Sequence, residues 1–245
     1  MTRHVRAPFF EIGVKNYLYG DAVLELARVA DEEAGRYDVD VLFIAPLVEL
    51  RRVCEHTSRL IVLAPHMDLI DPGRGLSKIL PESVRAVGAA GVVMNHIEDP
   101  MSIGMLRRSI ERARELGLLS FVCADSIEEA EALARFRPDV INPEPSDRIG
   151  TSGGVPLGFA ADSTRAVHAV SPQTLVEQAA GITSPEDVHA LIASGADGVG
   201  VASGIVAAPD PVRAARDMIG ALAHARDQRI AGTVPASERN ACHGD

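Results

Sequence analysis

The chain has 245 residues, 47% of them hydrophobic, and a formal net charge of −10 at pH 7. A chain of this length can bury a core without crosslinks, so it is expected to form one large domain or two small ones. The negative charge argues against nucleic acid and an anionic membrane as partners, and no apolar run is long enough to span a bilayer. Three cysteines without a paired spacing, and a start without a signal-like apolar segment, predict a cytoplasmic protein.

Short apolar runs rich in β-branched residues alternate with amphipathic helical patterns along most of the chain. The predicted strands are residues 8–14, 40–45, 60–65, 91–95, 119–124, 139–142, 174–179 and 197–201. The predicted helices are residues 21–35, 47–56, 81–87, 101–116, 127–136, 184–193 and 211–226. Asp99 and Pro100 are the expected N-cap and first residue of the helix at 101–116.

Strands that alternate with helices predict a parallel sheet covered by helices. Eight strands without a break in composition favour a single-domain α/β structure, a closed (β/α)8 barrel over residues 1–231, and an open doubly wound sheet is the alternative. Residues 232–245 are polar and are predicted to form a flexible tail. In a barrel of this kind the active site lies at the carboxyl ends of the strands.

Polar side chains follow five of the predicted strands, and they are Lys15, His66, His96, Asp125 and Glu144. Glu144 stands between two prolines, which stiffen the backbone around it, and the permissive Gly150 follows six residues later. A fixed base followed by a loop that can bend suits proton chemistry from which water is excluded. Taken alone, this stretch is more typical of an ordinary proline-rich strand exit with a solvated glutamate.

Glycine-rich turns follow the seventh and eighth predicted strands, at Ala180-Gly181 and Ser203-Gly204. Backbone N–H groups in such turns suit a phosphate. An ammonium, an imidazole, a carboxylate and two such turns can hold a small anionic carbonyl compound and remove a proton beside its carbonyl. Structural alternatives remain, such as a solvated lysine at the rim or a core histidine bonded to backbone. We interpret His66 as structural rather than as a metal ligand.

Several short motifs carry a resemblance to a known family. They are Asn95-His96-Ile97-Glu98, Val122-Cys123-Ala124-Asp125, Glu144-Pro145 with Ile149-Gly150-Thr151, Gly195-Ala196-Asp197-Gly198 and Ala202-Ser203-Gly204. They stand in the order and spacing of the triosephosphate isomerase family, and the chain most resembles the short archaeal-type form. The likeness covers about residues 8–225 and implies the TIM-barrel fold.

The resemblance implies an aldose–ketose isomerase that interconverts dihydroxyacetone phosphate and glyceraldehyde 3-phosphate through an enediolate. Glu144 matches the base that moves a proton between C1 and C2, and His96 matches the neutral electrophile that polarises the carbonyl. Lys15 matches the lysine that holds the substrate, and Glu98 matches a carboxylate that supports this lysine. The resemblance implies neither a cofactor nor a metal.

The resemblance also implies where the phosphate of a small sugar phosphate binds. Its partners are backbone groups at Gly150, Ala180, Gly181, Ala202 and Ser203, and Gly13 is expected to lie beside the substrate. Gly150 belongs to a lid that is expected to run from residue 145 to about residue 151. In the family the loop that matches residues 72–77 docks into a second subunit, so a homodimer or a homotetramer is implied.

The chain departs from the family pattern at Gly13, Leu76, Ile97 and Asp99, where the family has asparagine, threonine, serine and arginine. Loss of an amide that donates to a charged substrate costs about 1.5–3 kcal/mol, whereas loss of a general base costs on the order of 10²–10⁴-fold in rate. Because the base is present, we expect intact isomerase chemistry with shifted recognition. Triose phosphate is the leading substrate, and a four-carbon ketose phosphate of the erythrulose phosphate type is the alternative. The replaced residues also leave open a paralogue that binds phosphometabolites without catalysis.

Overall fold

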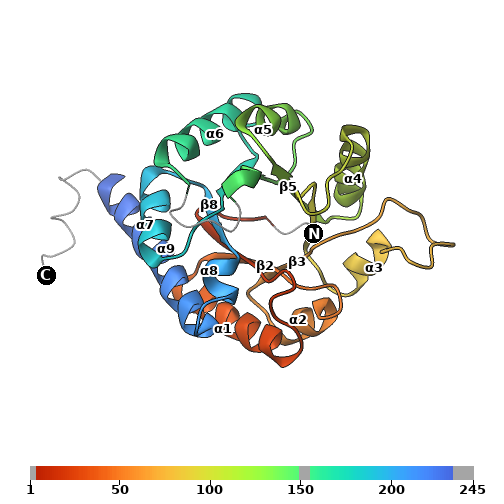
Figure 1. Cartoon of the computed structure of the whole chain (residues 1–245), viewed down its shortest axis with the longest axis horizontal. Helices are drawn as coiled ribbons and strands as arrows, with labels where there is room; N and C mark the ends of the chain where they lie inside the picture. The colour runs from red at the N-terminus through yellow and green to blue at the C-terminus, as the bar shows by residue number, and fades with distance from the viewer. Residues whose placement is uncertain (1–3, 149–154, 234–245) are drawn as a thin grey trace, which may run out of the picture.

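The computed structural model of the chain describes residues 4–148 and 155–233. These residues form a closed barrel in which each strand pairs in parallel with the next, and β8 pairs with β1. Figure 1 shows the helices as a ring around the strands. The single closed barrel predicted from the sequence is therefore confirmed.

The strands are β1 Phe9–Gly13, β2 Asp40–Ile44, β3 Ile61–Ala64, β4 Gly91–Met94, β5 Leu119–Ala124, β6 Val140–Pro143, β7 Leu175–Gln178 and β8 Gly198–Val201. The helices are α1 Asp21–Tyr37, α2 Leu50–His56, α3 Pro81–Ala86, α4 Ile103–Glu115, α5 Ile127–Ala134, α6 Leu157–Val170, α7 Pro185–Ser194, α8 Ser203–Val206 and α9 Pro211–Thr233, and a 3-10 turn, η1, spans Ser146–Arg148. Within the described part of the chain, no helix has both the length and the apolar character needed to cross a bilayer. The helix α9 includes the first two positions of the predicted tail, and the rest of that tail lies outside the described residues.

Apolar side chains fill the lower interior of the barrel. Phe9, Leu63 and Phe121 belong to one buried cluster contributed by β1, β3 and β5. Gly198 makes room for the Phe9 ring, because a Cβ at this position would lie 2.3 Å from the Phe9 Cζ atom. A barrel packed in this way is a core and not a pore, so its chemistry is confined to the strand ends.

The helix α6 is not predicted by the sequence pattern. Gly158, Ser163 and Thr164 are weak helix formers, and they obscure the apolar periodicity of this segment. Packing compensates in the structure, since Ser163 and Val167 are buried and Gln178 of β7 donates a hydrogen bond to Ser163 Oγ at 3.0 Å. Tertiary contacts therefore form this helix against a weak local preference.

The predicted start of α4 is wrong. The helix begins at Ile103, and Ser102 caps it by accepting a hydrogen bond from the Met105 N–H at its Oγ atom. Asp99, the predicted cap, instead bonds His66, with 2.6 Å between Oδ2 and Nδ1. A partner distant in the sequence thus outweighs the local capping signal.

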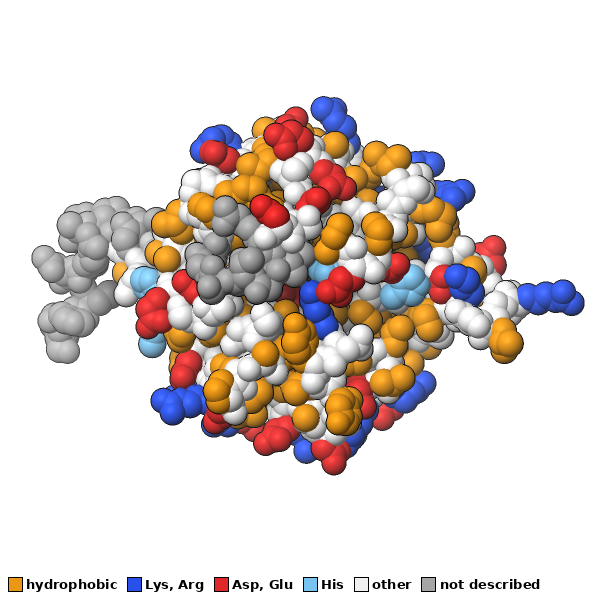
Figure 2. All heavy atoms as spheres, viewed as in Figure 1, with side chains coloured by type: hydrophobic (Ala, Val, Ile, Leu, Met, Phe, Trp, Pro, Cys, Tyr) orange, Lys and Arg blue, Asp and Glu red, His pale blue; other side chains and the backbone are white. Residues whose placement is uncertain are grey.

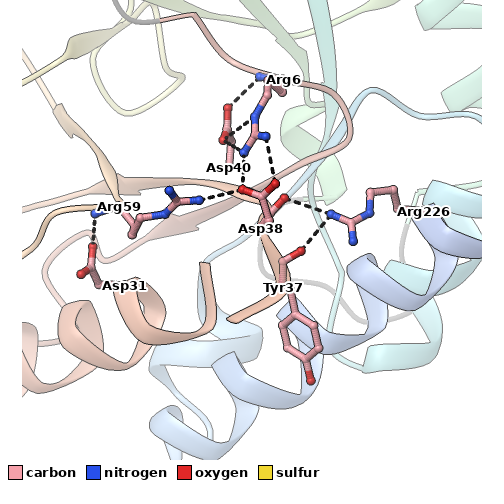
Figure 3. Close-up of polar contacts among 7 residues, drawn as sticks. All are labelled: Arg6, Asp31, Tyr37, Asp38, Asp40, Arg59 and Arg226. Atoms are coloured by element: carbon pink, nitrogen blue, oxygen red, sulfur yellow. Dashed lines mark hydrogen bonds and ion pairs between the residues drawn. The ribbon is translucent and has the colours of Figure 1, made fainter. Parts of the chain in front are cut away.

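A charged network lies at the amino-terminal end of β2 (Figure 3). The Arg6 guanidinium bonds Asp40 at 2.8 Å and Asp38 at 3.1 Å, and Arg59 bonds Asp38 at 2.8 Å. Arg226 of α9 donates to the backbone carbonyl of Asp38 at 3.0 Å, which links the end of α1 to the last helix. Hydrogen bonds from Arg6, and then from Arg59, lower the pKa of Asp38.

We expect Asp38→Asn to lower the melting temperature at neutral pH, most strongly at low salt, because it removes the charge that both guanidinium groups face. Asparagine tolerates the left-handed backbone at this position, φ 46°, so strain does not confound the comparison. Because the folded pKa of Asp38 is depressed, its contribution is present above the unfolded pKa and is lost as pH falls through the folded pKa. Thermal unfolding across acid pH, with low and high salt, measures this difference.

The control for this prediction is Asp162→Asn, which removes a surface carboxylate that pairs with Arg165 one helical turn away. We expect little change in melting temperature for this variant, as is usual for an isolated exposed pair. Equal shifts in the two variants, or a shift for Asp38→Asn that ignores salt and pH, would contradict the prediction.

Candidate active site

Lys15 lies two residues after the end of β1 and has a left-handed backbone, φ 48°, which is uncommon outside glycine. Its Nζ atom lies 3.0 Å from Glu98 Oε1, in the loop after β4. This ion pair joins two loops that are distant in the sequence, and it holds the ammonium group at the carboxyl-terminal mouth of the barrel. Figure 2 shows basic, acidic and histidine side chains gathered near the centre of this face.

His96 follows β4 and faces Glu144, with 3.7 Å between His96 Nε2 and Glu144 Oε2. The other ring nitrogen, Nδ1, accepts a hydrogen bond from the Glu98 N–H at 3.1 Å. A nitrogen that accepts carries no proton, so the neutral ring bears its proton on Nε2, towards Glu144. Burial, and then the charge of Lys15, lower the pKa of His96 and favour this neutral form.

Glu144 follows β6, and its backbone N–H donates to the Ala124 carbonyl at 2.8 Å. Its side chain is 12% exposed. Burial raises the pKa of Glu144, whereas the charge of Lys15 and a hydrogen bond from the Asn142 side chain oppose the rise. The carboxylate is therefore a stronger base than a solvated glutamate, and it still has partners for its charged form.

The turns after β7 and β8 meet at the same mouth. Ala180 and Gly181 both have φ 68°, and Ala202 precedes the four-residue helix α8. A Cβ on Gly204 would lie 2.3 Å from the Ile182 carbonyl oxygen, so this glycine lets the two turns pack closely. Ala202 and Ser203 thus lie near the turn that carries Ala180 and Gly181. The structure therefore brings Ala180, Gly181, Ala202 and Ser203 together at one mouth, and their contact with a phosphate stays a prediction.

The start of the predicted lid is described, and its glycine is not. Gly150 lies outside the described residues, as do residues 149 and 151, whereas residues 145–148 of the predicted lid are described. The turn η1 begins at Ser146, whose N–H donates to Asp125 Oδ1 at 2.6 Å. Asp125, at the end of β5, thus anchors the chain directly after Glu144.

Asn95 is a site residue that the sequence reasoning missed. It has φ 61° and precedes His96. Its side-chain amide donates to the Cys123 carbonyl at 3.0 Å and to Glu129 Oε1 at 3.3 Å, and its Oδ1 accepts from the Met101 N–H at 3.0 Å. These bonds fix the loop that presents His96. Asparagine tolerates the left-handed region, and its place directly before the histidine was the available signal.

The four departures from the family pattern differ in their surroundings. Asp99 bonds His66, whose Nε2 also lies 3.4 Å from Asp68 Oδ2, and Leu76 and Ile97 are exposed. A Cβ on Gly13 would lie 3.2 Å from Glu11 Oε1. Within the described part of the chain, no group of three or more His, Cys, Asp or Glu side chains is placed to hold a metal ion.

A cavity of about 170 Å³ opens beside the two facing groups. Its lining includes the facing side chains of His96 and Glu144, together with Ile97, Met101 and Asp125. The cavity therefore extends from the reacting groups towards β4 and β5, away from the turns after β7 and β8.

Comparison with known proteins adds independent observations to this geometry. The family model described as triosephosphate isomerase matches residues 12–218. A triosephosphate isomerase of Methanopyrus kandleri is 37% identical over 226 residues, which covers 89% of this chain and 99% of that protein. A triosephosphate isomerase of Methanobacterium bryantii is 32% identical over 226 residues, with the same coverage.

Among solved structures, the triosephosphate isomerase of Bartonella henselae superimposes with a TM-score of 0.66 at 16% identity, over 87% of this chain and 99% of that one. At this identity the likeness concerns the fold, which agrees with the closed barrel described above. Because the family model and the archaeal relatives cover most of the chain, the chain belongs to the triosephosphate isomerase family, as its sequence motifs predict.

Proposed function

We propose that the chain interconverts dihydroxyacetone phosphate and glyceraldehyde 3-phosphate, as an intramolecular oxidoreductase that works through an enediolate. The observation that carries this proposal is the placement of a buried carboxylate 3.7 Å from a neutral imidazole at the mouth that also holds Lys15. Membership of an isomerase family supports the same reaction. A cytoplasmic location remains a prediction from the sequence.

In this mechanism Glu144 is the general base. It takes a proton from one carbon beside the carbonyl oxygen and returns it to the neighbouring carbon. Burial raises its pKa and so raises its affinity for that proton, while Lys15 keeps the carboxylate ionised before reaction. A placed general base of this kind contributes about 10²–10⁴-fold to the rate.

His96 is the proposed electrophile. The Nε2–H of the neutral ring donates to the substrate oxygen on which negative charge develops. A charged imidazolium beside Glu144 would instead form an ion pair with the base and reduce its reactivity. The Glu98 N–H holds the tautomer, and the Glu98 carboxylate holds Lys15, whose charge stabilises the enediolate.

Backbone groups at the β7 and β8 turns are the proposed phosphate partners. These are Ala180, Gly181, Ala202 and Ser203, and Gly150 would join them from the lid. Gly13 forms part of the wall beside the substrate. With its phosphate held at the β7 and β8 turns, the substrate would place its reacting carbons between Glu144 and His96, which line the cavity.

A second candidate substrate is a four-carbon ketose phosphate of the erythrulose phosphate type. The cavity of about 170 Å³ beside His96 and Glu144 favours it, because this space adjoins the groups between which a three-carbon substrate would bind. Gly13 also lacks the side chain that the family has at this position. A non-catalytic phosphometabolite-binding role accounts less well for a base and a neutral imidazole held face to face.

We also propose that the chain forms a homodimer or a homotetramer. The loop between β3 and α3 projects from the barrel in Figure 1, and Figure 2 shows hydrophobic and basic side chains on this projection. Leu76 in this loop is fully exposed. The resemblance assigns this loop to a contact with a second subunit, and such a contact would remove the Leu76 side chain from water.

We expect Lys15→Met to raise the pKa of His96, because the charge of Lys15 is one of the causes that lower it. The pKa should still remain below that of a solvated histidine, since burial is the larger cause. A nuclear magnetic resonance titration of the imidazole measures both values. The control is Lys78→Met, because Lys78 pairs with Asp68 and its charge is not among the causes that shift the pKa of His96. A His96 pKa that stays constant or falls in Lys15→Met would contradict the electrostatic account.

We expect Glu144→Gln to lower turnover of triose phosphate by about 10²–10⁴-fold, because the amide cannot accept the proton. In the unmodified enzyme, kcat/KM should rise with pH through a pKa above the usual glutamate range, since burial raises the pKa of Glu144 and only the carboxylate is active. Assays with three-carbon and four-carbon ketose phosphates, run in deuterated water, measure turnover and proton exchange together.

The control in this assay is Glu55→Gln, a surface glutamate that pairs with Arg51. Greater turnover of the four-carbon substrate would favour the second candidate. Binding of either substrate without deuterium uptake would establish the non-catalytic role. Turnover of triose phosphate that is equal in Glu144→Gln and the unmodified chain would rule out the proposed base.

We expect Leu76→Glu to shift the oligomer towards the monomer, because a charge at the loop tip disfavours burial in an interface. Light scattering at micromolar concentration measures the mass of both proteins. A monomer for the unmodified chain, or an unchanged oligomer for Leu76→Glu, would contradict the proposed contact.

A further inference from the structure

The layer of interior side chains next to the carboxyl-terminal mouth of the barrel contains polar residues, where apolar residues are usual. Glu11 of β1, Asn142 of β6 and Glu177 of β7 are 5%, 4% and 0% exposed. The mechanism proposed above uses neither Glu11 nor Glu177. Burial of two carboxyl groups costs stability, so their presence calls for a compensating role.

The two carboxyl groups converge on Gly200 of β8. A Cβ at this position would lie 2.2 Å from Glu177 Oε1 and 2.7 Å from Glu11 Oε2. Gly200 therefore provides the space that both carboxyl groups occupy. Two carboxylates this close, in a buried site, cannot both be ionised.

Four oxygen atoms in this layer are buried without a hydrogen-bond partner among the described residues. They are Glu11 Oε1, both oxygens of Glu177 and Asn142 Oδ1. Oxygens alone cannot satisfy one another, because each is an acceptor. A proton on a carboxyl group changes this balance, since a carboxylic acid offers an O–H donor to a neighbouring oxygen.

Strand register places Asn142 beside Glu177. Val140 pairs with Leu175 and Ile141 pairs with Val176, so the next interior positions on β6 and β7 are Asn142 and Glu177. The Asn142 side chain also makes a hydrogen bond to Glu144 that favours the charged carboxylate. Asn142 thus stands between the buried acid pair and the proposed base.

We propose that Glu177 is held as a protonated carboxylic acid and positions Glu144 through Asn142. The Glu177 O–H donates to Asn142 Oδ1, and the Asn142 amide donates to the Glu144 carboxylate. Glu11 shares the proton with Glu177. The inference rests on the proposed function, because it assigns these residues a role in holding the proposed base.

Electrostatics agree with the geometry. Burial raises the pKa of Glu177, and the charges of Glu11 and Glu144 raise it further. Burial and Glu144 raise the pKa of Glu11, whereas Lys15 lowers it. The buried thiol of Cys123 also faces these groups. At high pH the pair loses its proton, the donor to Asn142 disappears, and a second negative charge appears below the base, so isomerisation should fall.

Two substitutions at position 177 separate this role from simple packing. Glu177→Gln keeps an N–H donor for Asn142, so kcat should stay close to that of the unmodified enzyme while its alkaline decline disappears. Glu177→Met keeps the length of the side chain but has no donor, so kcat should fall about tenfold with little change in KM. Leu175→Ala, one interior position lower on β7, is the control for lost packing and should lower the melting temperature without changing the pH profile.

A second measurement does not depend on turnover. Infrared spectra of protein with isotope-labelled glutamate should show a protonated carboxyl band at neutral pH that shifts or weakens in Glu177→Gln, where Glu11 is the remaining member of the pair. Absence of this band from the unmodified protein, or wild-type kcat and pH dependence in Glu177→Met, would overturn the proposal. Failure of the unmodified protein to isomerise any ketose phosphate would count against the proposed function, while the infrared band would still report whether the acid pair holds its proton.

Discussion

Closure of the parallel sheet is the constraint on which the rest of the structure depends. Because every strand runs in the same direction, the residues that follow the strands all meet at one end of the barrel. Lys15, His96 and Glu144 follow β1, β4 and β6, and they reach one mouth only because β8 pairs with β1. Glycines inside the barrel permit this closure by giving up volume to larger neighbours, as Gly198 does for Phe9.

Within that mouth, one charge acts together with burial on both facing groups. Burial alone would favour a protonated Glu144 and a neutral His96, which leaves no base. The charge of Lys15 lowers both pKa values, so it opposes burial at Glu144 and reinforces it at His96. The charge of Lys15 thus favours an ionised carboxylate and a neutral imidazole, the combination that the proposed mechanism requires. Glu98 holds Lys15 in position, and its backbone N–H fixes the tautomer of His96.

The sequence predicts the barrel and the facing residues because both follow local rules. Apolar periodicity marks each strand, and the polar residue after a strand must lie at the mouth. The predictions that failed have a different cause. Asp99 leaves its predicted cap for His66, and α6 forms through contacts with β7, so in both cases a distant partner decides. The buried Glu177 is missed for the same reason, since a charged residue in a strand looks solvent-facing until Gly200 of the neighbouring strand is seen to make room for it.

The two ends of the barrel use charge in opposite ways. At the amino-terminal end, Arg6 and Arg59 surround Asp38 at the surface, where each carboxylate has donors and the network adds to stability. Below the mouth, Glu11 and Glu177 are buried with orphaned oxygens, an arrangement that lowers stability unless a proton is retained. A cost of this kind persists in proteins where it supports function, because selection removes only what falls below the stability that activity needs. The acid pair is connected to Glu144 through the Asn142 side chain, so its proposed role in holding the base gives this loss of stability a functional reason.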